Sequence, residues 1–162
     1  MTPEVFAAIA ILPGATIAAA HGLDSPEARL LLMAVAGQES AWAARQQVPV
    51  AYAHGYWQEE IEAVQQAFDG RETGPIIRAL CEGLDVPDDA ATVFEAIVWC
   101  DPLAYLVARL TLLPDPEPLP VIGDEAAALA YYRRTWRPGS FAPSRWVGRY
   151  QAALAALGMT HQ

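Results

Sequence analysis

The sequence contains no lysine: its ten basic residues are all arginine, against nineteen acidic residues, and the formal net charge is −9. Without lysine, Schiff-base chemistry and a lysine-bearing phosphate loop are excluded. A strongly acidic chain also makes a poor general ligand for nucleic acid or for anionic lipid, since both require clustered cations. We therefore expect no nucleic-acid partner.

Cysteine and histidine are also scarce. Two cysteines, Cys81 and Cys100, are too few for a disulfide framework or a cysteine-based zinc site. Free cysteines are commonly buried, so we expect two buried thiols, with a single disulfide as the alternative. His21, His54 and His161 lack the spacing of a metal-binding motif. The sequence thus predicts neither a metal nor another cofactor.

A secretory signal is missing as well, although residues 6–20 are apolar and small. No basic residue precedes Arg29, and Glu4 lies where such a signal has its positive region. Pro13-Gly14 interrupts the apolar run before the roughly 20 residues that a membrane span needs. We expect folded structure here, no membrane insertion, and synthesis in the cytoplasm without a signal peptide.

Helix signals, in contrast, are frequent, and strand signals are scarce. Ser25-Pro26-Glu27 combines an N-cap, a first-turn proline and an acid suited to the helix dipole, and predicts a buried helix from 26 to about 44. The pattern predicts one compact all-α domain over residues 1–162, with six to eight helices. The other segments are N-terminal helices at 3–20, broken at Pro13-Gly14, then a loop at 45–56, helices at 57–68, 75–82, 88–100, 102–113, 124–137 and 143–157, and a stiff proline-rich connector at 114–120.

Glu39 is the most informative residue, because it lies near the end of the buried helix. Its helical face also carries Leu32, Val35, Ala36 and Trp42. Apolar surroundings raise the pKa of a carboxyl group, and the helix C-terminus acts in the same direction. A carboxylic acid that keeps its proton near neutrality suits the general acid of glycoside cleavage. The alternative is a glutamate in water at the helix end, or one that caps a neighbouring loop.

Two aromatic segments are further candidates. In HGYWQEE at 54–60, the rings of Tyr56 and Trp57 suit stacking on sugars, and the Gln58 amide suits hydroxyl or N-acetyl groups. In YYRRTWRPG at 131–139, Tyr132 and Trp136 share a helical face. Core packing is the alternative for both segments. The arginines of the second segment fit a solvated face or contacts with carboxylates.

In this order the motifs resemble the lytic transglycosylase and goose-type lysozyme superfamily, most closely its small bacteriophage and prophage proteins. Those proteins read roughly LQES, ARGFWQFE, DPRPLP and AWDYYLRNWRPGKP; the matching stretches here are AGQESAW, AHGYWQEE, DPEPLP and ALAYYRRTWRPGS. The resemblance covers residues 26–150. It implies a lysozyme-like helical domain that cleaves peptidoglycan glycan strands between N-acetylmuramic acid and N-acetylglucosamine.

The resemblance also implies residue roles. Glu39 protonates the glycosidic oxygen and then acts as base while the 6-hydroxyl of the sugar closes a 1,6-anhydro ring. Ser40 helps to position the glutamate or the substrate. Gln58 contacts the N-acetyl group in a site that Tyr56 and Trp57 shape.

The late block and the residues after Gln58 carry the remaining expectations. Either Tyr131 or Tyr132 contacts the catalytic acid, and Trp136 contributes to substrate binding. Glu59 stands where the phage proteins have phenylalanine. Glu60 is the candidate general base of a hydrolytic route, so anhydro formation and plain hydrolysis both stay open.

A catalytically inactive phage virion or assembly protein with this fold is the alternative function. The net charge of −9 and the altered late block favour it. A helical interaction module, with the aromatic loop as its partner patch, is a third reading. The expected partners are peptidoglycan glycan strands, or other virion proteins in the alternative. The expected destinations are the virion, or the periplasm during phage infection.

Overall fold

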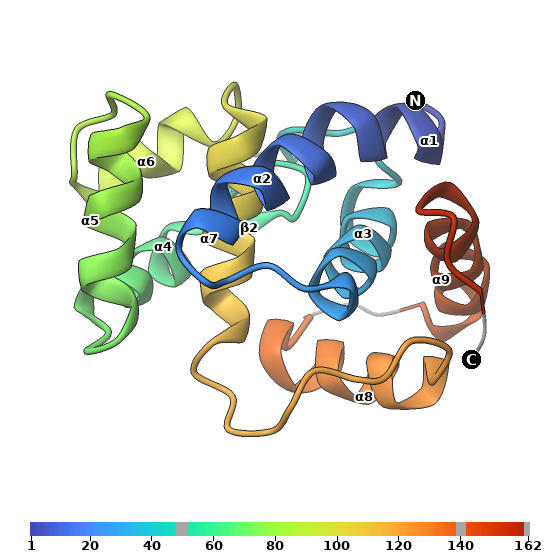
Figure 1. The fold of residues 1–162 in the computed structure, drawn as a ribbon. Coiled ribbons are helices and arrows are strands. Elements are labelled where there is room, and N and C mark those ends of the chain that lie inside the picture. The colour runs from blue at the N-terminus through green and yellow to red at the C-terminus, as the bar shows by residue number, and fades with distance from the viewer. Residues whose placement is uncertain (48–51, 139–141, 161–162) are drawn as a thin grey trace.

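The structure is a computed structural model that describes residues 1–47, 52–138 and 142–160. Within those residues the chain forms eight helical segments and one two-stranded hairpin (Figure 1). The prediction of a mostly helical domain with six to eight helices is confirmed at that level. The first helical segment joins α1 (Pro3–Phe6), a π-helical turn (Ala7–Ile11) and α2 (Leu12–Ala20); the others are α3 (Pro26–Ser40), α4 (Ile61–Asp69), α5 (Thr73–Gly83), α6 (Ala90–Ala96), α7 (Asp101–Leu112), α8 (Glu125–Trp136) and α9 (Pro143–Ala156).

The N-terminal segment is continuous, so the predicted break at Pro13-Gly14 is wrong. Leu12 N donates to Ala7 O across a wide π turn, directly before Pro13 in the first turn of α2. There the missing N–H of proline removes no necessary bond. Gly14 serves close packing: a Cβ at this position would lie 2.5 Å from the side chain of Tyr105.

By length and composition alone, residues 3–20 are also sufficient to cross a membrane, with a mean hydropathy of 1.6. Core helices and signal sequences meet the same criterion. In this fold 39% of the segment is buried, and Phe6, Ala10 and Ile11 belong to the hydrophobic core. Within this structure the segment packs against the hydrophobic core.

The core is built around α3. Ser25 Oγ accepts a hydrogen bond from Ala28 N at 3.1 Å, which confirms the predicted N-cap. From Leu30 to Gly37 every residue of the helix is buried. α9 packs along α3, α2 packs on α7, and α4 packs against both α5 and α6. Figure 1 shows α4, α5 and α6 on one side of α7, with α3, α8 and α9 on the other.

α3 ends at Ser40, four residues earlier than predicted. Ala41 and Trp42 adopt left-handed backbone conformations, with φ of 54° and 57°. The indole of Trp42 folds back over Gly37, where a Cβ would come within 2.4 Å of the ring. Its Nε1 donates to Met33 O at 2.9 Å. Trp42 thus folds back onto the side of its own helix, and α3 ends directly after Glu39 and Ser40.

The segment after α3 also differs from the prediction. Residues 53–60 form an antiparallel hairpin of β1 (Ala53–His54) and β2 (Glu59–Glu60), and α4 begins at residue 61 rather than 57.

Asp101 lies inside the first turn of α7 and binds the Arg45 guanidinium, with Nη2 and Oδ2 2.9 Å apart, instead of capping the helix. Both cysteines are free thiols; Cys81 is buried and Cys100 half-buried.

Candidate functional site

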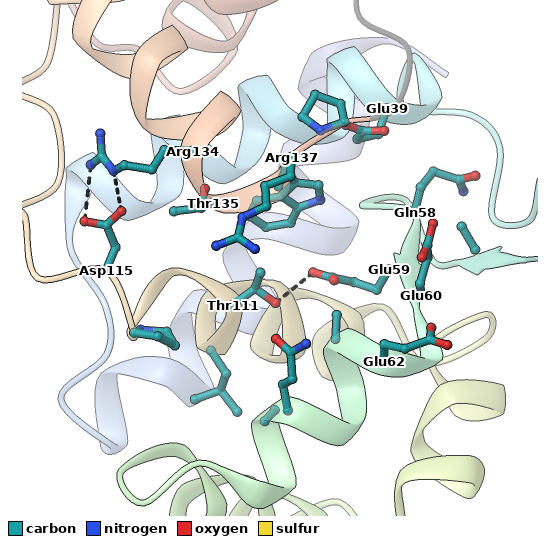
Figure 2. Close-up of a pocket in the computed structure, with 18 of the residues that line it drawn as sticks. Glu39, Gln58, Glu59, Glu60, Glu62, Thr111, Asp115, Arg134, Thr135 and Arg137 are labelled. Atoms are coloured by element: carbon teal, nitrogen blue, oxygen red, sulfur yellow. Dashed lines mark hydrogen bonds and ion pairs between the residues drawn. The ribbon is translucent and has the colours of Figure 1, made fainter.

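A groove of about 1180 Å³ lies between α3, the hairpin, α4, α7 and the end of α8 (Figure 2). It is somewhat larger than typical small-molecule pockets, which hold roughly 300–1,000 Å³. Of the predicted site residues, the groove is lined by Glu39, Gln58, Glu60 and Trp136. The fold therefore brings together residues that are up to 97 positions apart in the chain.

The Glu39 carboxyl forms a short hydrogen bond across the site. Tyr132 on α8 donates its hydroxyl proton to Glu39 Oε1 at 2.5 Å. The Tyr132 ring stacks on Trp146, with 5.1 Å between ring centroids and 11° between the planes. α8 and α9 together therefore fix the hydroxyl opposite the end of α3.

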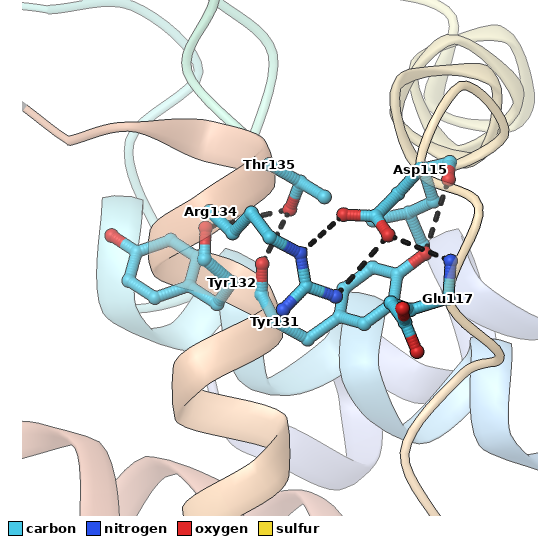
Figure 3. Close-up of polar contacts among 7 residues, drawn as sticks. Asp115, Glu117, Tyr131, Tyr132, Arg134 and Thr135 are labelled. Carbon is cyan, nitrogen blue, oxygen red and sulfur yellow. Dashed lines mark hydrogen bonds and ion pairs between the residues drawn. The ribbon is translucent and has the colours of Figure 1, made fainter.

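The choice between the two tyrosines of the late helix is thus decided by the packing of α8. Tyr131 faces the other way and donates its hydroxyl to Leu112 O at 3.2 Å. Figure 3 shows the two rings leaving α8 in different directions. Tyr132 is the one that contacts Glu39.

Burial raises the pKa of Glu39, and the hydrogen bond from Tyr132 opposes this shift by stabilising the anion. The tyrosine pKa is raised as well, mainly by burial and then by this hydrogen bond, so Tyr132 stays a neutral donor. The site therefore holds one carboxyl of increased proton affinity and a fixed hydrogen-bond donor. Such a pair is suited to give and to take back a proton.

Gln58 reaches the groove from the turn of the hairpin. Its backbone is left-handed, with φ of 53°. Its Nε2 donates to Gly55 O at 2.8 Å, which leaves the amide oxygen as an acceptor for a ligand. Gln38 lines the groove too, and its Oε1 is buried without a hydrogen-bond partner among the described residues. The Gln58 amide oxygen is thus available to a ligand at this wall, whereas the Gln38 amide oxygen is enclosed by the protein.

Glu59 is a groove residue whose chemistry the sequence reasoning missed. Its side chain is 3% exposed, and its Oε1 lies 3.1 Å from Thr111 Oγ1. The pKa of Glu59 is raised to about 8, chiefly by burial, while the hydrogen bond from Thr111 opposes the shift and the charges of Glu39 and Glu60 add to it. Glu59 is consequently a neutral carboxylic acid at pH 7. The signal that could have identified Glu59 was the glutamate itself, which stands where the phage proteins have phenylalanine.

Besides Tyr131 and Tyr132, three more predicted site residues are outside the groove lining: Ser40, Tyr56 and Trp57. Ser40 Oγ donates to Ala36 O at 2.9 Å, so its hydroxyl is directed into its own helix. Tyr56 and Trp57 are 2% and 0% exposed and pack in the hydrophobic core. The expectation that their rings contact a sugar directly is wrong, because core packing covers both ring faces. Trp57 instead holds the hairpin to α3, since its Nε1 donates to Leu32 O at 2.8 Å.

Trp136 and Glu60 both line the groove. Trp136 is half-buried at the end of α8, and its Nε1 donates to the carbonyl oxygen of Trp57 at 3.1 Å. Glu60 is exposed beside Glu59. The indole provides an apolar surface, and the exposed carboxyl of Glu60 is accessible to solvent water.

Charge is divided between the walls of the groove. One wall carries Glu39, Glu59, Glu60 and Glu62, which we call the acid wall. Arg134, Arg137 and Arg145 line the groove as well, and Figure 2 shows Arg134, paired with Asp115, across the groove from these carboxyl groups. In Figure 2 the Arg137 guanidinium lies between the two groups of side chains. The groove thus presents carboxyl groups and guanidinium groups to the same ligand.

Among the residues that the structure describes, no group of three histidine, cysteine or acidic side chains is placed to hold a metal ion. Comparison with protein-family models, with curated proteins and with solved structures finds no match for this chain. The candidate function therefore depends on the site itself and on the motif resemblance.

Proposed function

We propose that this protein cleaves the glycan strands of peptidoglycan between N-acetylmuramic acid and N-acetylglucosamine, with Glu39 as the general acid and then the general base. One observation carries the proposal: the Glu39 carboxyl lines a large groove, has a raised pKa, and is bound by the hydroxyl of Tyr132. The order of the sequence motifs supports the substrate class.

In the proposed reaction Glu39 gives its proton to the glycosidic oxygen as the bond to the departing sugar breaks. Tyr132 keeps the resulting carboxylate in place and stabilises its charge through the 2.5 Å hydrogen bond. The carboxylate then takes a proton from the 6-hydroxyl of the N-acetylmuramic acid residue, whose 6-oxygen bonds to C1 of the same residue and closes a 1,6-anhydro ring. The amide oxygen of Gln58 suits the N–H of an N-acetyl group or a sugar hydroxyl.

A hydrolytic outcome needs a second base that activates water. Glu60 is the candidate, since it is exposed at the groove next to the hairpin turn. Glu59 does not fit this role, because a carboxyl group that is neutral at pH 7 cannot accept a proton. The product distinguishes the routes, because the anhydro muropeptide is one water lighter than the hydrolysed one.

The test is digestion of purified peptidoglycan, with the products analysed by mass spectrometry. We expect release by the wild type and a loss of roughly 10²–10⁴-fold for Glu39→Gln. Glu95→Gln, an exposed glutamate on α6 outside the groove lining, is the matched control and should behave as wild type. No release by a folded wild type would contradict the proposal and favour the inactive virion or assembly protein.

A further inference from the structure

The arginines of this acidic protein are concentrated in one stretch. Residues 133–149, which we call the arginine segment, contain five of the ten arginines and no acidic residue. All nineteen aspartates and glutamates belong to the rest of the chain. Although the net charge of the chain is −9, the arginine segment has a local excess of positive charge. The electrostatic potential that a bound ligand experiences depends on this local distribution of charge.

Most arginines of this segment are already engaged. Arg134 Nε lies 2.5 Å from Asp115 Oδ2, and its guanidinium stacks over the Tyr131 ring at 4.7 Å (Figure 3). Arg149 lies over the indole of Trp42 at 4.8 Å. In contrast, Arg137 and Arg145 line the groove, and neither forms an ion pair with any described carboxylate.

The backbone directs Arg137 toward the groove. Its φ of 46° is left-handed, which ends α8. Pro138 follows, and a proline disfavours the α-helical conformation of the residue before it. The side chain consequently leaves the helix axis, and Figure 2 shows its guanidinium above Thr111 and Glu59. No described carboxylate forms an ion pair with this guanidinium, so it is available to a ligand.

We propose that Arg137 and Arg145 form a subsite for carboxylate groups carried by substituents of the glycan strand. This inference rests on the proposed function and adds which part of the substrate each wall binds. The uncharged sugar backbone lies along the acid wall, and the acidic substituents reach the guanidinium groups opposite. Guanidinium groups bind carboxylates through paired hydrogen bonds. A polymer with charge along its backbone, such as nucleic acid, is repelled by Glu39 and Glu60.

Two carboxylate sources fit, the lactyl group of muramic acid and the peptide stem, and three ligands separate them. The ligands are soluble glycan strands with peptide stems, the same strands after an amidase has removed the stems, and chitin oligosaccharides of equal length, which lack carboxylates. Binding is measured by calorimetry in the Glu39→Gln background, so that no ligand is consumed. Arg137→Gln/Arg145→Gln is compared with Arg71→Gln, an exposed arginine outside the groove lining.

We expect the double variant to bind stem-bearing strands about 5–20-fold more weakly, from roughly 2–5-fold for each exposed ion pair. Added salt should weaken wild-type binding of these strands toward the level of the double variant. Chitin oligosaccharides should bind both proteins alike, and Arg71→Gln should have no effect. A loss confined to stem-bearing strands assigns the subsite to the peptide carboxylates. A loss that also occurs on amidase-treated strands extends the subsite to the lactyl carboxyl, which is free only after its amide bond to the stem has been cut.

Two other outcomes are distinguishable. If the double variant binds all three ligands as tightly as its parent, the inference is overturned and the proposed function stands. If the parent binds none of them although it is folded by circular dichroism, the proposed function itself fails.

Discussion

The two sides of the groove use opposite means to present charge. On the acid wall, burial raises the pKa of Glu39 and of Glu59, so their charge depends on pH. On the other side, arginines stay charged at every physiological pH. The acid wall therefore provides protons, and the arginine side provides a fixed field. A groove with this division suits a ligand that is neutral along one edge and anionic along the other.

The largest expected effect concerns Glu59, the most buried carboxyl of the acid wall. Its pKa in the folded protein, about 8, exceeds the ordinary value of 4.5. The contribution of protonated Glu59 to folding stability is therefore fully present below pH 4.5 and is lost as the pH rises through 8. In Glu59→Gln this loss should disappear. At pH 9 the variant should exceed the wild type by about 5 kcal/mol in unfolding free energy, measured by urea denaturation.

Glu60→Gln is the matched control for that experiment, because Glu60 is an exposed neighbour on the same strand. It should keep the decline of stability with pH. If the unfolding free energy depends on pH in the same way for the wild type and Glu59→Gln, Glu59 ionises freely in the folded protein. The acid wall would then resemble an ordinary solvated surface.

The next effect concerns the close packing of Trp42 on Gly37 at the end of α3, next to Glu39. Gly37→Ala places a Cβ 2.4 Å from the Trp42 indole. The ring must move, and we expect a loss of about 1–3 kcal/mol from overpacking. Gly83→Ala is the control, since nothing lies within 4 Å of its added Cβ. Thermal unfolding should separate the two variants, and equal melting temperatures would contradict the close packing of Trp42 on Gly37.

A smaller effect concerns the hydrogen bond between Tyr132 and Glu39. Tyr132→Phe removes the hydrogen bond that opposes the pKa shift of Glu39. The Glu39 pKa should therefore rise further, because the carboxylate loses a hydrogen bond that stabilises its charge. Carbon-13 NMR titration of the side-chain carboxyls measures this shift. Tyr131→Phe should leave the Glu39 titration unchanged, because its hydroxyl binds Leu112 O; a shift in that variant instead would reverse the assignment.

The smallest effect is expected on the arginine side. Arg134 lowers the pKa of Asp115, so their pair stabilises the fold above the ordinary aspartate pKa and is lost as the pH falls through the depressed one. Arg134→Gln should lower the melting temperature slightly at neutral pH and low salt. The difference should vanish in high salt, because exposed pairs are screened. A large, salt-independent loss would mean that the pair acts as a buried one.

Local patterns predicted the helices well. The N-cap at Ser25, the proline after it and the apolar run of α3 are determined by neighbouring residues, and that helix starts where expected. Features that depend on distant contacts were predicted less well. α3 ends early because Trp42 folds back on Gly37, and the α1–α2 segment continues because a π turn accommodates Pro13 and Gly14 packs on Tyr105.

The candidate site divides in the same manner. Periodicity placed Glu39 on an apolar face, and the raised pKa agrees with that expectation. Helical spacing did not distinguish Tyr131 from Tyr132, since adjacent residues leave a helix 100° apart and the partners lie on other elements. The rings of Tyr56 and Trp57 suited a sugar as well as a core, and packing against Phe6 and Tyr105 decided for the core.

By itself, the sequence determined the helical character, the start of the central helix and the position of Glu39 on an apolar helical face, because these follow from interactions within a few turns. Tertiary structure decided which tyrosine binds Glu39, that Glu59 is held neutral beside it, and that the arginines face the acids across one groove. Proton affinity and field direction depend on what surrounds a group in space, and the chain order does not specify those neighbours.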